Sequence, residues 1–157
     1  MRSVLPTIED ICRLKILTEA AQKARLNAYA PYSKYLVGAA IMTQKGDVYV
    51  GCNASGADYY GTHAEAAALA SMVVNGDRSP VSIVCVGALE DMQNAPFVAP
   101  CGACRQKIME FASLSDYDVR ILGRDSDQNP IVHLISDLLP DAFGPADLGI
   151  NLAKYRR

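Results

Sequence analysis

Two short motifs in this chain carry side chains that bind metal ions. The first is a His-Ala-Glu run at residues 63–65, and the second is a Pro-Cys-Gly-Ala-Cys run at residues 100–104. One imidazole and two thiolates are typical of a zinc site, and three protein ligands leave the fourth tetrahedral position open for water. An open position distinguishes a catalytic zinc from a structural one. The residues therefore predict Zn²⁺ as the cofactor, bound by His63, Cys101 and Cys104, and metal-assisted hydrolysis as the chemistry.

Glu65 is the expected catalytic residue. It is too close to His63 in the sequence to be an obvious fourth ligand. Zinc lowers the pKa of its bound water from about 15.7 toward about 7, and a nearby carboxylate can take the water proton and pass it to a substrate ring nitrogen and to leaving ammonia. The H-x-E…P-C-x-x-C signature is typical of zinc-dependent base deaminases. We therefore predict that Glu65 carries the proton.

Each motif has a simpler explanation when it is taken alone. A single Cys-x-x-Cys is also found in redox pairs and as half of a structural zinc site, and a lone His-x-Glu is frequent by chance. A structural site would need a fourth ligand, yet His133 lies in an apolar, strand-like run and Cys85 lies in the middle of a predicted strand. The pair of motifs therefore favours a catalytic site over a non-catalytic, zinc-stabilised binding module.

The predicted secondary structure places both motifs at the starts of helices. A helix start near Asp10 is consistent with either Asp10 as the cap or a capping box of Thr7 and Asp10. The order of elements predicts helices on both faces of a largely parallel or mixed sheet. Hydrophobic periodicity and turn signals give helices at 11–28, 62–75, 102–111 and 135–139, a hairpin of strands 36–43 and 47–53, and strands at 81–89, 117–122 and 130–134.

The spacing of the ligands suits convergence on one metal ion. Cys101 and Cys104 are three residues apart and so are neighbours on one helical turn. Helix N-termini carry partial positive charge, which favours thiolate over thiol. The 38 residues between His63 and Cys101 (101 − 63) accommodate a helix, a strand and a loop. Two adjacent strand-to-helix junctions can therefore meet at one edge of the sheet.

Length and composition are those of an ordinary globular protein. The 157 residues predict a single zinc-dependent deaminase domain, 1–157, and the net charge of -2 argues against nucleic acid as a partner. We expect neither a secretory signal nor a membrane segment, since no apolar run reaches ~20 residues. The odd number of cysteines favours the cytoplasm over a disulfide framework, and Cys12, Cys52 and Cys85 are interpreted as small buried hydrophobic residues.

The chain resembles the short-chain, zinc-dependent cytidine deaminase family along nearly its whole length. This resemblance implies a three-layer α/β/α sandwich with a mixed five-stranded sheet, usually assembled as a homotetramer. It also implies hydrolytic deamination of cytidine or deoxycytidine to uridine or deoxyuridine with release of ammonia, so the partner is a small pyrimidine nucleoside. The matching stretches are residues 28–35, 37–40, 51–53, 100–106 and 138–148.

The same resemblance implies roles for residues outside the zinc motifs. Asn53 is expected to hydrogen-bond the ribose, and Tyr35 to form an aromatic wall beside the pyrimidine. Phe143 is expected to reach toward an active site, that of a neighbouring subunit. The backbone at Ala64 and near Ala99 is expected to contact the amino group.

Two positions depart from the pattern of the family. His63 stands where short-chain members usually have cysteine, and Ala66 stands where they have arginine. Three thiolates leave zinc with a net charge of -1, whereas two thiolates and a neutral imidazole leave it at zero. A nearby arginine can offset the extra negative charge of a third thiolate, and a site without that thiolate does not need the arginine. We therefore infer that the site works.

Ser55 is the second departure, since the family usually has glutamate there, in a loop that is one residue longer. Serine weakens the charge-assisted hydrogen bond to the sugar, although Asp58, Tyr59 and Tyr60 in the loop could compensate. The change favours an alternative substrate, an N4-substituted or blasticidin S-like cytosine nucleoside, whereas the 138–148 stretch favours ordinary cytidine. Editing of RNA or DNA is disfavoured by the net negative charge of the chain.

Three biological settings are compatible with the sequence: salvage, drug resistance and detoxification.

Overall fold

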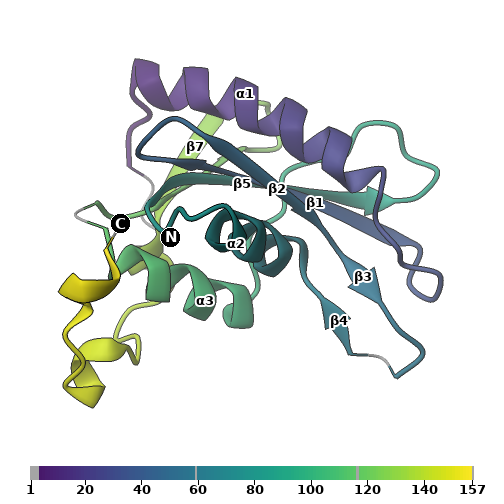
Figure 1. The fold of residues 1–157 in the computed structure, drawn as a ribbon. Helices are drawn as coiled ribbons and strands as arrows, with labels where there is room; N and C mark the ends of the chain where they lie inside the picture. Colours follow the sequence, from purple (N-terminus) through teal and green to yellow (C-terminus); the bar gives the residue numbers. More distant parts are fainter. Residues whose placement is uncertain (1–3, 59, 116, 157) are drawn as a thin grey trace.

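A five-stranded sheet forms the centre of the computed structural model, which describes residues 4–58, 60–115 and 117–156. Its strands lie in the order β2-β1-β5-β6-β7, and β3 and β4 pair separately as a short hairpin (Figure 1). The strands are β1 (Tyr35–Thr43), β2 (Val48–Cys52), β3 (Ala54–Ser55), β4 (Gly61–Thr62), β5 (Pro80–Leu89), β6 (Arg120–Arg124) and β7 (Pro130–Leu134). The helices are α1 (Ile8–Arg25), α2 (Ala64–Val74), α3 (Gly102–Ala112) and α4 (Ile135–Leu138), followed by the 3₁₀ turns η1 (Pro145–Leu148) and η2 (Leu152–Tyr155).

The sheet is mixed rather than largely parallel. β1 runs antiparallel to both β2 and β5, and β6 runs antiparallel to β7. Among the described strands, only β5 and β6 are parallel neighbours, and the crossover between them contains α3. Of the two alternatives, a largely parallel or a mixed sheet, the mixed five-stranded sheet is therefore confirmed, because the two hairpins and the pairing of β1 with β5 supply antiparallel neighbours.

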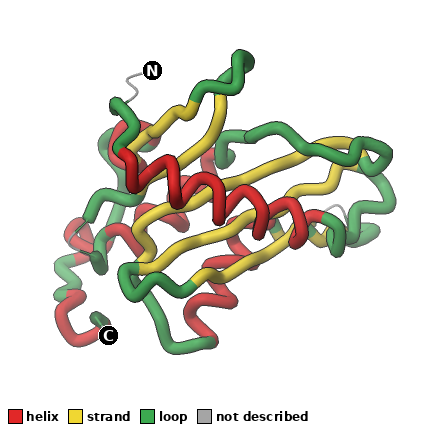
Figure 2. Tube along the Cα trace, turned by 90° about the horizontal axis from the view of Figure 1, so that it is seen from above, coloured by secondary structure: helices red, strands yellow, loops and turns green. Residues whose placement is uncertain are grey.

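Helices cover both faces of this sheet and complete a three-layer α/β/α sandwich. α1 crosses one face, and α2 and α3 cover the other (Figures 1 and 2). Successive residues of β1 point to opposite faces of the sheet and so belong to two different hydrophobic cores. Ala40 packs with Leu14 and Leu17 of α1. Ala39 and Ile41 pack on the opposite face, with α2 and α3. The predicted fold class is confirmed.

The first helix begins and ends three residues earlier than the periodicity predicts. Thr7 is the N-cap: its hydroxyl accepts a hydrogen bond from the Asp10 N–H at 3.1 Å, and the Asp10 carboxylate accepts one from the Thr7 N–H at 2.9 Å. This capping box resolves the two alternatives in favour of Thr7. Ile11 consequently lies on the exposed side of the helix, and Ala28 lies beyond its end.

Two smaller expectations are also corrected. The strand predicted at 117–122 is β6, Arg120–Arg124, and Tyr117 lies outside it with an exposed side chain. Of the cysteines outside the zinc motifs, Cys85 is buried as predicted, but Cys12 is exposed and Cys52 is half-buried; all five are free thiols. Among the described residues, no helix combines the length and the apolar character needed to cross a membrane.

Candidate active site

The three predicted ligands meet at the N-termini of α2 and α3. His63 is the N-cap of α2, Cys101 is the N-cap of α3, and Cys104 lies in the first turn of α3. The His63 Nδ1 atom is 3.3 Å from the Cys101 Sγ atom and 3.3 Å from the Cys104 Sγ atom. A tetrahedral zinc ion bound by the same atoms would hold each nitrogen–sulfur pair about 3.5 Å apart. The three side chains therefore fit zinc, with Nδ1 as the ligand atom of His63.

A close approach between α2 and β2 positions the first of these ligands. At Gly51 of β2, a Cβ atom would lie 2.3 Å from the Ala68 nitrogen and 2.5 Å from the Ala64 carbonyl oxygen. Only glycine allows backbone atoms to come so near. The first turn of α2, which carries Glu65 and follows His63, is thereby held against the sheet.

Arg105 fixes the turn that precedes Cys101. Its Nε donates a hydrogen bond to the Pro100 carbonyl at 2.8 Å, and its Nη1 donates one to the Leu138 carbonyl at 3.0 Å. Arg105 follows Cys104 directly, so one side chain ties both cysteines to the end of α4. Sequence reasoning assigned no role to Arg105.

Glu65 is buried beside the metal cluster, with 6% of its surface exposed. Burial raises the pKa of the Cys104 thiol, and the negative charge of Glu65 raises it further. Burial, followed by the charge of Glu65, also raises the pKa of the buried Cys85 thiol. In the metal-free protein Cys104 is therefore a thiol, and binding of a metal ion must displace its proton.

A cavity of about 410 Å³ opens onto this cluster and gathers most of the predicted site residues. Two ends can be distinguished: the metal end, formed by His63, Glu65 and Cys101, and the hairpin end, formed by Asn53, Ser55 and Gly61. Thr62 and Val98 also line the cavity, and no sequence signal marked them. The complete lining is Tyr35, Val37, Asn53, Ser55, Gly61, Thr62, His63, Ala64, Glu65, Val98, Ala99 and Cys101.

Comparison with known proteins identifies the family. Residues 13–116 match the model described as the cytidine and deoxycytidylate deaminase zinc-binding region. The chain belongs to this deaminase family. A cytidine deaminase of Sporosarcina psychrophila is 39% identical, with 85% of this chain and 93% of the relative covered.

Solved structures agree with this assignment. The crystal structure of cytidine deaminase from Burkholderia pseudomallei is 39% identical and superposes with a TM-score of 0.70, covering 82% of this chain and 98% of that one. The enzyme from Mycobacterium tuberculosis is 30% identical with a TM-score of 0.68, covering 83% of this chain and 96% of that one. This deaminase-family chain therefore has a zinc-binding region, and His63, Cys101 and Cys104 are able to hold the metal ion.

Asn53 is held in a fixed orientation at the hairpin end of the deaminase cavity. Its side-chain oxygen accepts a hydrogen bond from the Val37 N–H at 2.8 Å, and its side-chain nitrogen donates one to the Tyr35 carbonyl at 3.0 Å. An amide side chain has two donors and two acceptor lone pairs, so one of each is left for a ligand. Asn53 thus joins β1 to the start of the hairpin while facing the cavity.

The hairpin end of the deaminase cavity is uncharged. Ser55 of β3 pairs with Gly61 of β4, and among the described lining residues Glu65, at the other end, provides the only carboxylate. The Asp58 carboxylate accepts a hydrogen bond from the Tyr60 N–H at 3.1 Å and does not line the cavity. Compensation for Ser55 by Asp58 or Tyr60 is thus not seen, and Tyr59 lies outside the described residues.

Ala66 borders a second hollow, of about 330 Å³, on another side of the metal cluster. His63, Cys104 and Lys107 also line it. Lys107 is exposed and lies one helical turn after Cys104. The position at which the deaminase family usually has arginine is therefore open space here, with a cation on the facing helix.

Phe143 lies outside the cavity of its own chain. Its side chain is 61% exposed, and its carbonyl accepts a hydrogen bond from the Gln106 Nε2 atom at 2.7 Å. Gln106 bonds the Phe143 carbonyl, and Arg105 bonds the Leu138 carbonyl. These hydrogen bonds join the two stretches that resemble the deaminase family, residues 100–106 and 138–148.

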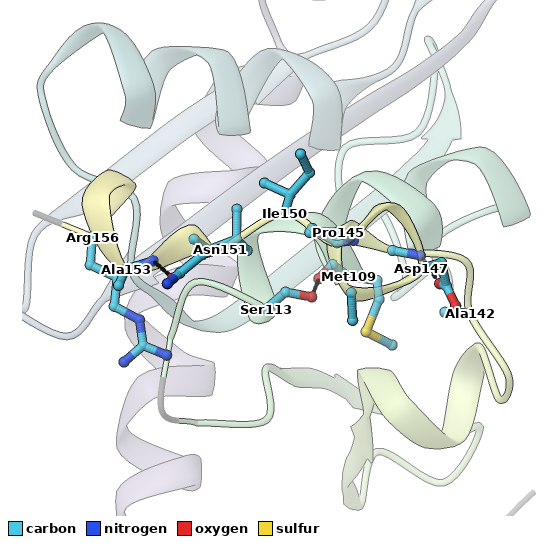
Figure 3. A pocket seen from close by; sticks show the side chains of 12 residues that line it. Met109, Ser113, Ala142, Pro145, Asp147, Ile150, Asn151, Ala153 and Arg156 are labelled. Atoms are coloured by element: carbon cyan, nitrogen blue, oxygen red, sulfur yellow. Dashed lines mark hydrogen bonds between the residues drawn. The ribbon is translucent and has the colours of Figure 1, made fainter.

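A larger hollow, of about 560 Å³, lies between α3 and the C-terminal segment (Figure 3). Two of its polar side chains hydrogen-bond backbone groups close by in the sequence. The Ser113 hydroxyl donates to the Met109 carbonyl at 2.9 Å, and the Asn151 side chain accepts from the Ala153 N–H at 2.9 Å. The described residues that line it include no histidine or cysteine. The metal-binding side chains therefore border the smaller cavity and not this hollow.

Proposed function

We propose that this protein catalyses the hydrolytic deamination of cytidine and deoxycytidine to uridine and deoxyuridine with release of ammonia. The observation that carries the proposal is the placement of a buried carboxylate, Glu65, in a cavity that is also lined by His63 and Cys101, two members of the cluster able to hold a metal ion. Relatives that are named cytidine deaminase support it. A non-catalytic binding module has no use for a buried carboxylate beside an open metal position.

The residues of the cavity divide the reaction between them. When bound, zinc supplies a Lewis acid that makes water reactive near neutral pH. Glu65 accepts one proton of the attacking water and delivers it to N3 of the pyrimidine, while the water oxygen bonds to C4. Glu65 then transfers the remaining proton of the resulting C4 hydroxyl to the amino group, which leaves as ammonia as the C4 carbonyl forms. Water adds, ammonia leaves, and Glu65 returns to its carboxylate form.

Binding and orientation of the substrate are assigned to the cavity lining. The Tyr35 ring contacts the face of the pyrimidine, and the backbone at Ala64 and Ala99 contacts its amino group. Asn53 has one donor and one acceptor left for the sugar hydroxyls, and Ser55 offers a neutral hydroxyl. These roles follow the family resemblance, and the shared cavity supports them.

A second candidate substrate is a modified cytosine nucleoside, N4-substituted or blasticidin S-like. The observation in its favour is the uncharged hairpin end, where Ser55 replaces the glutamate that the family usually has. Without a carboxylate, the sugar is held by weaker hydrogen bonds and the enzyme tolerates changes in it. The sugar preference therefore depends on Asn53 and Ser55.

We also propose a homotetramer in which Phe143 contributes to the cavity of a neighbouring subunit. Its exposed side chain outside its own cavity supports this arrangement. Light scattering after size-exclusion chromatography measures the assembly. A mass of one chain in solution together with full activity would contradict it.

The proposed function is tested by a substrate panel scored by kcat/KM. Zinc-loaded protein is assayed for formation of the uracil product from cytidine, deoxycytidine, an N4-methylated cytidine and blasticidin S; the N4-methylated compound releases methylamine and the other three release ammonia. Cytidine and deoxycytidine are expected to be used with kcat/KM values that differ by less than about tenfold, because no carboxylate grips the ribose. Absence of the uracil product with all four compounds would refute the enzymatic proposal, and product from the modified compounds alone would favour the second candidate.

A further inference from the structure

Gly87 is a buried residue near the end of β5, beside a residue that lines the cavity. In the antiparallel pair of β1 and β5 it stands opposite Val37, and directly opposed residues project to the same face of a sheet. Val37 lines the cavity, so a side chain at position 87 would point toward it. On the other edge, the Gly87 N–H donates a hydrogen bond to the Pro96 carbonyl at 3.0 Å. Gly87 is thus flanked by two segments that both reach the cavity.

The Tyr35 ring occupies the space that a side chain at position 87 would fill. A Cβ atom there would lie 2.9 Å from the Tyr35 Cε1 atom, 3.1 Å from its hydroxyl oxygen and 3.3 Å from its Cζ atom. Comfortable contacts between carbon atoms are ~3.5–4.0 Å. The outer edge of the ring therefore rests on the backbone of Gly87, and it can do so only because residue 87 has no side chain.

We propose that Gly87 is a positioning residue that fixes the Tyr35 ring and thereby sets the width of the cavity for a planar pyrimidine. The inference rests on the proposed function, because the ring position affects turnover only if this cavity takes the substrate. The metal end is built from α2 and α3, whereas Tyr35 and Gly87 belong to β1 and β5. A change at position 87 therefore alters substrate binding and leaves the proton transfer by Glu65 in place.

The fold accommodates an alanine at this position. Gly87 is not among the glycines with a positive φ angle, so its backbone conformation is one that alanine adopts. The three nearest atoms to the added Cβ all belong to the outer part of the Tyr35 side chain, which can shift by rotation. Gly87→Ala is expected to stay folded while the ring moves into the cavity.

A double-mutant cycle tests the proposal. In zinc-loaded protein, Gly87→Ala is expected to raise KM for cytidine by about two- to tenfold, the range that one aromatic contact contributes, with kcat changed by less than about twofold. Tyr35→Ala is expected to raise KM similarly, and adding Gly87→Ala to Tyr35→Ala is expected to cause no further rise. Gly144→Ala is the control, since a Cβ there meets nothing within 4 Å.

Several results would overturn the role of Gly87. They are an unchanged KM in Gly87→Ala, KM effects that multiply in the double variant, or a double variant that fails to fold although the ring is gone. If wild-type protein shows no turnover, the proposed function fails instead, and crystal structures of wild type and Gly87→Ala then decide the matter. A displaced Tyr35 ring supports the positioning role, and an unmoved ring refutes it.

Discussion

The metal end of the cavity rests on two helices that each pack one face into the core, whereas the hairpin end is an exposed pair of two-residue strands. Cys104 and Glu65 are buried, and α2 and α3 pack into the core through Ala68, Leu69 and Ile108. Ser55 and Gly61 belong to β3 and β4, which pair outside the main sheet. Groups held by a packed core keep the geometry that chemistry needs, while an exposed hairpin can change its residues at little cost to folding. The proposed chemistry thus depends on helices packed into the core, and the proposed sugar recognition depends on the exposed hairpin.

Removing a metal ligand should have the largest effect. Cys104→Ser is expected to lower zinc affinity and kcat/KM by more than about 100-fold, because losses of 10–100-fold already follow changes in residues that only support a ligand. Cys12→Ser, an exposed cysteine of α1, is the matched control. Metal content and ammonia release measure both. A zinc-free Cys104→Ser protein with normal turnover would show that the metal end does not carry the chemistry.

Asn53→Ala should have an intermediate effect, because Asn53 joins the hairpin end of the cavity to β1. Loss of its bonds to Val37 and Tyr35 is expected to lower the free energy of unfolding by about 1–3 kcal/mol and to raise KM more than it lowers kcat. Asn75→Ala is the control, since among the described residues that side chain bonds the Ser71 carbonyl alone, at the end of α2. Urea unfolding and steady-state kinetics report the two quantities. Equal losses in the control would mean that the connection has no special role.

Ser55→Glu should have the smallest effect and act only on the sugar. A carboxylate at this position is expected to raise kcat/KM for cytidine relative to deoxycytidine by about three- to tenfold, through a charge-assisted hydrogen bond. Ser126→Glu, in the exposed turn between β6 and β7, controls for added charge. An unchanged ratio would remove Ser55 from sugar recognition.

The same contrast explains how far the sequence could predict the molecule. The metal end was predictable because ligand chemistry, helix starts and hydrophobic periodicity all converge on His63, Cys101 and Cys104. The central strands and α2 and α3 were predictable for the same reason, since long apolar runs and alanine-rich helices leave few alternatives. Their bounds agree with β5, α2 and α3 to within two residues.

Contacts between distant segments were not predictable. The Tyr35 ring resting on Gly87, the approach of α2 to Gly51 and the bonds of Arg105 to Pro100 and Leu138 join residues that no local pattern links. The shift of α1 has a local cause, the capping box at Thr7, which competed with Asp10 as the helix start. Whether neighbouring strands run parallel or antiparallel also depends on which strands pair, and the pattern of a single strand does not show this.

The central claim is that Glu65 moves the proton in a zinc-dependent deamination of cytidine, and Glu65→Gln tests it most directly. Zinc content and uridine formation are measured together in the wild-type protein, in Glu65→Gln and in Glu110→Gln, an exposed position on α3. Glu65→Gln is expected to keep its zinc and lose about 10²–10⁴-fold in kcat, because glutamine cannot accept the proton. The Glu110→Gln control is expected to match the wild type. A zinc-loaded Glu65→Gln protein that forms uridine at the wild-type rate would contradict the claim.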